Sequence, residues 1–422
     1  MSEWQEVYLN EAFDIGSGLS KPAEDFGSGF PFLSFKEIFN NFFVPKELPE
    51  LVESSEEERD KCSVKKGDVF LTRTSETVKE LGMSCVALKD YENATFNGFT
   101  KRLRPNGNFE IVPEYTGYYF RSSKFRNDVT ALSSASTRAS LNNEMLGRLQ
   151  ILLPSKIEQE GIAAVLICLD RKISNLRQQN ETLEKIAQTL FKHWFVDFEF
   201  PNEDGKPYKS SGGEMVRSEL GEIPAGWCVK KIENVIDVRD GTHESPKQTK
   251  EGFHLITSKH LKKEGIDFKS AYLISESDYI EANKRSKVDN FDILVSMIGT
   301  VGLLYFVMEK EINFAIKNIG LFKTSKNQNY AEFVFLFLTS VYGKSYFRTR
   351  LGGTTQSFIS LASLREMNLL IPNELLLLEF RKVAKSIFNK SYANSNQIQI
   401  LTKTRDVLLP KLMSGKLRIT AS

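Results

Sequence analysis

The sequence predicts an α+β protein in which two similar α/β domains are joined by two long helices, so that the second half of the chain repeats the plan of the first. Three observations lead to this prediction. The chain has 422 residues, which is too long for one ordinary core and suits two domains of roughly 150 residues. Its two halves match at many positions in the same order. A sustained heptad pattern marks the first long helix.

The repeat has a period of about 220 residues. Each match is weak, but the matches are collinear, which favours a duplication over a chance likeness between two α/β domains. The clearest pairs are Trp4 and Trp227, Gly18 and Gly241, Lys36 and Lys259, Asp68 and Asp292, Pro154 and Pro372, and Leu190 and Leu408. We therefore expect a pseudo-two-fold internal repeat.

Each half shows the same order of predicted elements. Short β-rich runs come first, and turn residues bound the runs at 69–72 and 293–296. A helical stretch, a polar loop and a strand ending in Leu153-Pro154 or Ile371-Pro372 follow, and a long helix closes the half. The expected boundaries are a first domain over 1–154, a helix over 155–196, a linker over 197–226, a second domain over 227–372 and a second helical region over 373–418.

The first long helix carries the clearest periodicity in the chain. Its forty residues correspond to a rod of about 60 Å, which needs a partner because no small domain could bury it. The seam positions alternate spacings of four and three, with one polar member: Ile162, Leu166, Leu169, Ile173, Leu176, Asn180, Leu183, Ala187, Leu190 and Trp194. The matching positions of the second helix are polar in the middle: Phe380, Ala384, Ile387, Ser391, Asn394, Ile398, Leu401, Arg405, Leu408 and Leu412.

The bulk composition excludes several classes of protein. The four cysteines form no Cys-x-x-Cys pair, so neither a zinc site nor a disulfide framework is expected. No stretch approaches the roughly 18 apolar residues of a membrane span, and the first residues do not resemble a signal peptide. We therefore expect a cytoplasmic protein that does not associate with a membrane and that carries no metal or cofactor.

Charge is unevenly distributed along the chain. The formal net charge is +2, but residues 1–154 sum to −5 and residues 373–422 to +6. The acidic segment 53–60 accounts for much of the first value, and we expect it to be a solvated loop. A chain that held a nucleic acid alone would be basic throughout its contact surface. Binding to an anionic polymer would therefore need help from a partner.

Five motifs, in this order along the chain, resemble the specificity subunits of Type I restriction-modification systems. The likeness covers nearly the whole chain. The motifs are Leu152-Leu153-Pro154-x-x-Ile157-Glu158-Gln159-x-x-Ile162-Ala163, Gln188-Thr189-Leu190-Phe191-Lys192-x-Trp194-Phe195, Gly221-Glu222-Ile223-Pro224-x-Gly226-Trp227, Gly352-Gly353-Thr354-Thr355-Gln356 and Leu412-Met413-Ser414-Gly415-Lys416-Leu417.

The resemblance implies a non-catalytic subunit with two target-recognition domains, each of which reads half of a split asymmetric site in double-stranded DNA. It also implies that the two long helices pack as an antiparallel coiled coil and dock two methyltransferase subunits, through which restriction and translocase subunits join. One departure is that Leu376-Leu377 stand where the first helix has Glu158-Gln159. The acidic segment of the first domain is expected to lie away from DNA.

Base reading uses Arg or Lys for guanine, Asn or Gln for adenine, and hydroxyl residues for either. Three pairs of loops carry such residues, and ordinary turn chemistry explains any single loop equally well. The candidate contacts are Gly18, Lys21, Thr72, Arg73, Thr74, Thr137, Arg138 and Ser140 in the first domain, and Gly241, Thr242, His243, Ser296, Thr300, Thr355, Gln356 and Ser357 in the second. Lysines that could contact phosphates are Lys36, Lys101, Lys259 and Lys317.

Arg138 and Gln356 occupy equivalent positions and differ most pointedly. If both face base edges, the first domain favours guanine there and the second favours adenine. An independent enzyme is disfavoured because no catalytic constellation recurs between the repeats. Two alternatives stay open, namely a protein-binding adaptor with duplicated domains, and a specificity subunit of a methylation-only or Type II-like system.

Overall fold

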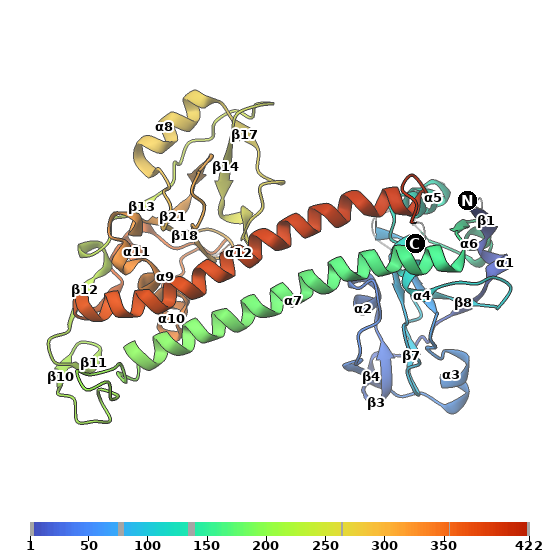
Figure 1. Ribbon diagram of the computed structural model, residues 1–422, viewed down its shortest axis with the longest axis horizontal. Helices are drawn as coiled ribbons and strands as arrows, with labels where there is room; N and C mark the ends of the chain where they lie inside the picture. The colour runs from blue at the N-terminus through green and yellow to red at the C-terminus, as the bar shows by residue number, and fades with distance from the viewer. Residues whose placement is uncertain (1–3, 75–79, 134–139, 263–264, 354, 420–422) are drawn as a thin grey trace. The chain divides into compact units, whose positions relative to one another are not determined.

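The computed structural model describes residues 4–74, 80–133, 140–262, 265–353 and 355–419. The chain divides into two compact units, a first unit of Met1–Ser174 with Gln399–Ser422 and a second unit of Asn175–Ile398 (Figure 1). Each long helix therefore contributes one half to each unit. This division differs from the expected one, in which the helices formed regions of their own.

The first unit combines three small sheets with short helices. A four-stranded antiparallel sheet has the order β2-β8-β5-β6, a three-stranded sheet has the order β4-β3-β7, and β1 pairs with β9. The elements are β1 (Gln5–Tyr8), α1 (Leu9–Ala12), β2 (Phe13–Ser17), β3 (Phe26–Leu33), α2 (Phe35–Asn40), β4 (Glu50–Val52), α3 (Glu56–Lys61), β5 (Val69–Thr72), β6 (Ser84–Val86), β7 (Thr95–Phe96), β8 (Thr100–Pro105), α4 (Pro113–Tyr119), α5 (Ser123–Ser133), α6 (Asn143–Gly147) and β9 (Gln150–Leu153), followed by α7 (Lys156–Phe195).

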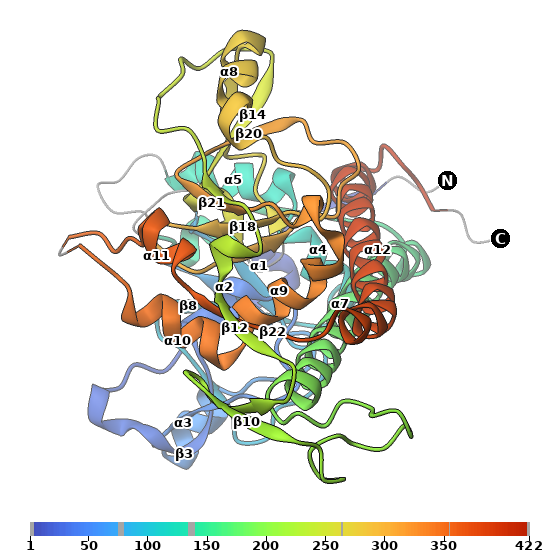
Figure 2. The same ribbon diagram turned by 90° about the vertical axis from the view of Figure 1, so that its left-hand side faces the viewer.

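The second unit repeats these sheets. Its four-stranded sheet has the order β13-β21-β18-β19, its three-stranded sheet the order β17-β14-β20, and β12 pairs with β22. Helix α8 packs against β14 and β20 (Figure 2). The elements are β10 (Met215–Ser218), β11 (Gly221–Pro224), β12 (Cys228–Lys231), β13 (Val238–Asp240), β14 (Phe253–Thr257), β15 (Leu261–Lys262), β16 (Gly265–Ile266), β17 (Leu273–Ile274), α8 (Glu276–Ser286), β18 (Ile293–Ser296), β19 (Leu304–Phe306), β20 (Phe314–Lys317), β21 (Ile319–Phe322), α9 (Ala331–Thr339), α10 (Val341–Thr349), α11 (Leu361–Arg365), β22 (Asn368–Ile371) and α12 (Glu374–Met413).

The shared sheet topology confirms the predicted duplication. An aspartate that occurs at the same place in both units helps to explain why they share one backbone conformation there. Asp68 accepts the backbone N–H of Lys65 and pairs with Arg104 at 2.6 Å. Asp292 accepts the N–H of Asp289 and pairs with Lys323 at 2.5 Å. Each aspartate thus fixes the turn before the central strand and is neutralised by a cation from the neighbouring strand.

Helices α7 and α12 contact each other along the predicted seam within both units. In the first unit, Arg405 donates to Asp170 at 2.8 Å, and Asp170 also accepts from Tyr118. In the second unit, Asn180 faces Asn394, and the ring of Trp194 lies against Phe380. Because rising residue numbers in α7 meet falling numbers in α12, the pairing is antiparallel in each unit. None of the twenty seam positions is exposed.

The polar centre of the seam is satisfied by hydrogen bonds. Asn394 is only 1% exposed, and its Nδ2 donates to Asn180 at 3.0 Å and to Gln179 at 3.3 Å. Asn180 in turn donates to the Oγ of Ser395 at 3.1 Å. A buried amide pair of this kind favours one register, because a shifted helix would leave the amides unpaired.

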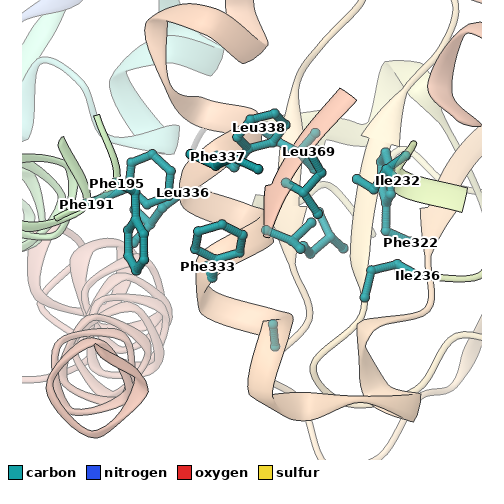
Figure 3. Close-up of a cluster of buried hydrophobic side chains, with 14 of the residues drawn as sticks. Phe191, Phe195, Ile232, Ile236, Phe322, Phe333, Leu336, Phe337, Leu338 and Leu369 are labelled. Carbon is teal, nitrogen blue, oxygen red and sulfur yellow. The ribbon is translucent and has the colours of Figure 1, made fainter. Parts of the chain in front are cut away.

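Aromatic residues join the end of α7 to the sheet domain of the second unit. Phe195 contacts Phe333 and Phe380, both with ring centroids 4.8 Å apart from its own, and Phe191 lies beside Phe333 (Figure 3). The same buried cluster includes Phe322 and Leu369 from strands β21 and β22. The helix is therefore anchored in the core of the domain and does not merely lie on its surface.

Three expectations about local structure were wrong. The acidic segment forms helix α3 instead of a loop, because Ser55 and Glu58 make a reciprocal capping box at its start. The expected linker contains the hairpin β10–β11, and its residues Phe200 and Ile223 are buried in the second core. Helix α12 ends at Met413, before the expected boundary, and the chain beyond it packs onto the first unit.

That terminal segment forms a polar clasp around Glu158 in the first unit. Arg418 donates to both Glu158 oxygens at 2.5 and 2.8 Å and lies over the ring of Trp4, whose indole N–H also donates to Glu158. At the equivalent place in the second unit, Phe200 stacks on Trp227 with centroids 5.2 Å apart. Leu376 accordingly replaces the glutamate, since an apolar neighbour suits the aromatic pair.

We expect Asn394→Ala to lower the free energy of unfolding by about 1–3 kcal/mol, because it leaves the partly buried side-chain oxygen of Asn180 without its N–H donor. Urea denaturation of the full chain measures this effect. The exposed Gln178→Ala serves as the matched control on α7 and should change stability by less than about 0.5 kcal/mol. A double Asn180→Leu, Asn394→Leu chain should recover stability. Equal losses in the single and double variants would contradict this account of the seam.

Candidate nucleic-acid interface

In the first unit, the predicted loops converge at one end of the four-stranded sheet. The backbone N–H of Arg73 donates to Phe99 at 3.0 Å, and that of Leu141 donates to Arg73 at 2.8 Å. Thr74 forms a bridge with Ser140, and Leu19 forms one with Asn97. We call residues 18–21, 72–74, 97–99 and 140 the first loop cluster.

The second unit assembles the corresponding loops in the same way. Thr242 donates to Ile316 at 3.0 Å and bridges Lys317, and Gly299 donates to Ser357 at 2.9 Å. We call residues 241–243, 296–300, 317–318 and 355–358 the second loop cluster. Loops that lie far apart in the sequence thus form one surface in each unit, and backbone hydrogen bonds fix each surface.

Gly18 and Gly241 are required by close backbone contacts. A Cβ at Gly18 would lie 2.3 Å from the carbonyl oxygen of Asn97, and one at Gly241 would lie 2.4 Å from that of Ile316. Both distances are far shorter than a van der Waals contact. These two glycines therefore shape the loop clusters and offer no side chain for recognition.

Thr72 and Ser296 also serve the loops themselves. Both are fully buried. The Thr72 hydroxyl donates to Glu80 and accepts from Met83, and the Ser296 hydroxyl donates to Thr300 and accepts from Leu303. Because both hydroxyls form hydrogen bonds within the protein, Thr72 and Ser296 are not among the base contacts that we propose.

The predicted lysines lie in different environments. Lys36 and Lys259 are exposed at equivalent places after β3 and β14. Lys21 pairs with Glu58 of the acidic helix at 3.0 Å, so that helix lies beside a predicted contact and not away from it. The hydrogen bond from Lys21 to Glu58 raises the pKa of the lysine, and the pKa of Glu58 is lowered by the backbone N–H of Ser55 and, next, by Lys21. Lys317 donates to the hydroxyl of Ser245.

The second loop cluster borders an open hollow of about 620 Å³. Three predicted residues, Lys259, Thr300 and Gln356, line it together with Lys262 and Asn318. Gln356 and Thr300 are exposed, as are Thr355 and Ser357 beside it. Amide, hydroxyl and ammonium groups therefore meet at one concave surface, which is the chemistry that base edges and phosphates require.

His243 is held at the rim of this surface by two contacts. Its Nδ1 lies 2.9 Å from the Asn318 side-chain oxygen, and its Nε2 lies 3.0 Å from a carboxylate oxygen of Asp240. Asp240 also pairs with Arg285. The imidazole is thus oriented by its neighbours, although its side chain is largely exposed.

Sequence reasoning missed two kinds of residue in the clusters. Asn318 adopts a left-handed backbone conformation, with φ of 51°, where β20 turns into β21. Two phenyl rings are unusually exposed, Phe99 at 59% in the first cluster and Phe358 at 46% in the second. The dipeptide Asn97-Gly98 is a turn signal that could have directed attention to Phe99.

Two predicted contacts, Thr137 and Arg138, lie outside the described residues. Of the two residues in the predicted contrast, Arg138 and Gln356, the structure therefore describes only Gln356. Among the described residues, no group of three His, Cys, Asp or Glu side chains is arranged to hold a metal ion. No helix in the described part of the chain is long and apolar enough to cross a membrane.

Comparisons with known proteins agree on one family. The model of the Type I restriction modification DNA specificity domain matches residues 1–185 and 224–374. The chain is 27% identical to the Type I restriction enzyme MjaIX specificity subunit of Methanocaldococcus jannaschii, over 99% of this chain and 94% of that protein. It is 24% identical to the HindI specificity subunit of Haemophilus influenzae, over 99% and 100% of the two chains.

A solved structure shares the fold. The crystal structure of the S subunit of a Type I restriction-modification system from M. genitalium aligns with a TM-score of 0.60 over 99% of this chain and 97% of that one. The two sequences are 15% identical, so this likeness concerns the fold alone. The two matched segments coincide with the two copies of the duplicated sheet topology.

Proposed function

Because the chain belongs to the Type I restriction modification DNA specificity family, we propose that it reads a bipartite, asymmetric site in double-stranded DNA for a methyltransferase complex. The observation that carries this proposal is the repeated loop cluster, since two equivalent sets of polar loops suit two half-sites. The chain supplies recognition and the partner subunits supply the chemistry.

Each half-site would be read by one loop cluster. In the second unit, Gln356 and Thr300 would contact base edges, and Lys259 and Lys262 would contact phosphates, since all four line the same hollow. In the first unit, Lys36 stands at the place of Lys259, and Thr74 and Ser140 bridge each other where Ile298 bridges Phe358. Because these side chains differ between the clusters, the two half-sites should differ in sequence.

The seam of α7 and α12 would set the spacing between half-sites. Helix α7 runs without a break for 40 residues, which corresponds to about 60 Å. Two readers joined by a stiff helix pair cannot slide relative to each other, so the number of unread base pairs between half-sites should be constant. The exposed side chains of the same helices would receive two methyltransferase subunits, through which restriction and translocase subunits would join.

Affinity for DNA would be shared with those partners. The formal net charge of +2 and the acidic helix α3 limit the number of counterions that this chain can displace from DNA. The isolated chain should therefore bind DNA weakly.

The proposal is tested by mapping modified bases across the DNA of a host with and without this chain, in the presence of its methyltransferase partner. Modification at one bipartite sequence should appear only with the chain. Loss of the chain without any change in modification would favour a protein-binding adaptor. Modification without restriction of foreign DNA would indicate a methylation-only or Type II-like system.

The identity of one recognised base should depend on Gln356. A glutamine can bind adenine through two hydrogen bonds and an arginine can bind guanine in the same way, each with about 1–3 kcal/mol of discrimination. We expect Gln356→Arg to replace an adenine by a guanine in the second half-site only. Ser345→Ala, at an exposed position of α10, serves as a control. An unchanged second half-site would dismiss this role of Gln356.

The length of the helices should control the spacing. We expect insertion of one four-residue helical turn before Leu183 to lengthen the unread gap, and deletion of one turn to shorten it, while both half-sites keep their letters. The same mapping of modified bases measures both quantities. Altered letters at an unchanged spacing would contradict the proposed role of the helices.

A further inference from the structure

Lys101 is a buried cation without an acidic partner. Lys101 is only 7% exposed, and its Nζ donates to the hydroxyl of Ser17 at 2.8 Å. No carboxylate among the described residues forms an ion pair with it. The cations of the neighbouring motif behave differently, since the partly exposed Arg104 pairs with Asp68 and the buried Lys323 pairs with Asp292. A buried charge without a counter-charge costs free energy, so Lys101 is not explained by folding.

A second cation lies beside it. Lys101 pairs with Leu71 across strands β8 and β5, and Arg73 follows two residues later, just beyond the end of β5. The Nε of Arg73 is buried and has no hydrogen-bond partner among the described residues. Burial and the nearby guanidinium both lower the pKa of Lys101. Two positive groups thus lie near each other, and no carboxylate among the described residues forms an ion pair with either of them.

The fold itself does not require these cations. The equivalent strand pair of the second unit joins Val295 to Gly320, so Gly320 stands at the place of Lys101. Met297 stands at the place of Arg73 and is buried. The same backbone therefore forms in the second unit with a thioether and no side chain, and the cation pair belongs to the first unit alone.

We propose that Lys101 and Arg73 form an anion site that binds one backbone phosphate of the first DNA half-site, an inference that rests on the proposed function. A phosphate would supply the missing negative charge and accept hydrogen bonds from both side chains. The site adjoins the first loop cluster, which includes Arg73, and the backbone N–H of Arg73 donates to the backbone oxygen of Phe99, whose side chain is exposed. The site would give the acidic first unit a local positive charge that contacts DNA.

The test removes the positive charge of Lys101 and keeps a side chain of similar volume. Lys101→Met in the full chain, assembled with its methyltransferase partners, is titrated with duplex DNA carrying the mapped site over a range of NaCl concentrations. We expect affinity at 0.1 M salt to fall about ten-fold and the salt dependence to lose about one counterion. The melting temperature of the DNA-free chain should stay equal or rise, because the uncompensated buried charge is gone.

Lys66→Met is the matched control, because Lys66 is an exposed lysine before the opposite end of β5. It should leave the number of released counterions unchanged. Equal binding by the Lys101 and Lys66 variants, or a lower melting temperature of Lys101→Met with unchanged binding, would overturn the inference. Stabilisation by inorganic phosphate that Lys101→Met abolishes, with DNA affinity intact, would overturn the assignment to DNA. A wild-type complex that binds no DNA would overturn the proposed function as well.

Discussion

The packing of α7 against α12 is the contact on which the rest of the structure depends. Neither helix belongs to one unit, since each completes the core of the first unit with one half and that of the second with the other. Leu166 and Met413 are buried in the first core, and Phe191 and Phe380 in the second. The seam is therefore part of both domain cores, and a change in its register would disturb both.

Both units keep one backbone plan while their chemistry diverges. Glu158, Arg418 and Trp4 form a charged clasp in the first unit, and Leu376, Phe200 and Trp227 fill the same place in the second. Beside the seam, Asp170 forms an ion pair with Arg405 in the first unit, whereas aromatic rings pack around Phe388 in the second unit. Since the shared backbone tolerates such replacements in its core, its exposed loops are freer still to vary with the DNA sequence.

Periodicity and repetition predicted the elements that depend on local pattern. The strands at Val69–Thr72 and Ile293–Ser296 and the helix Lys156–Phe195 match the expectation because their apolar spacing is regular. Helix α3 was predicted to be a loop because its segment is strongly acidic, although the two residues of its capping box, Ser55 and Glu58, can be read in the sequence. A sequence pattern of this kind identifies the start of a helix even where composition suggests a loop.

The contents of the loop clusters were harder to predict, because they depend on pairing between distant segments. Nothing local in the sequence indicates that Arg73 bonds to Phe99 or that Thr72 is buried. A hydroxyl in a loop motif is equally suited to a base edge and to a backbone amide, and only the structure distinguishes the two. Hence the sequence indicated the correct loops but only some of the side chains that they present.

If the seam is a stiff spacer, the distance between the two units is constant, and measuring that distance tests the stiffness most directly. Spin labels at Glu57→Cys on α3 and Glu281→Cys on α8, with the exposed Cys168 and Cys228 changed to serine, would report that distance by pulsed electron resonance. A stiff antiparallel seam predicts one narrow distance distribution, which Asn180→Leu with Asn394→Leu would broaden through alternative registers. A broad or multiple distribution in the unaltered seam would contradict the account.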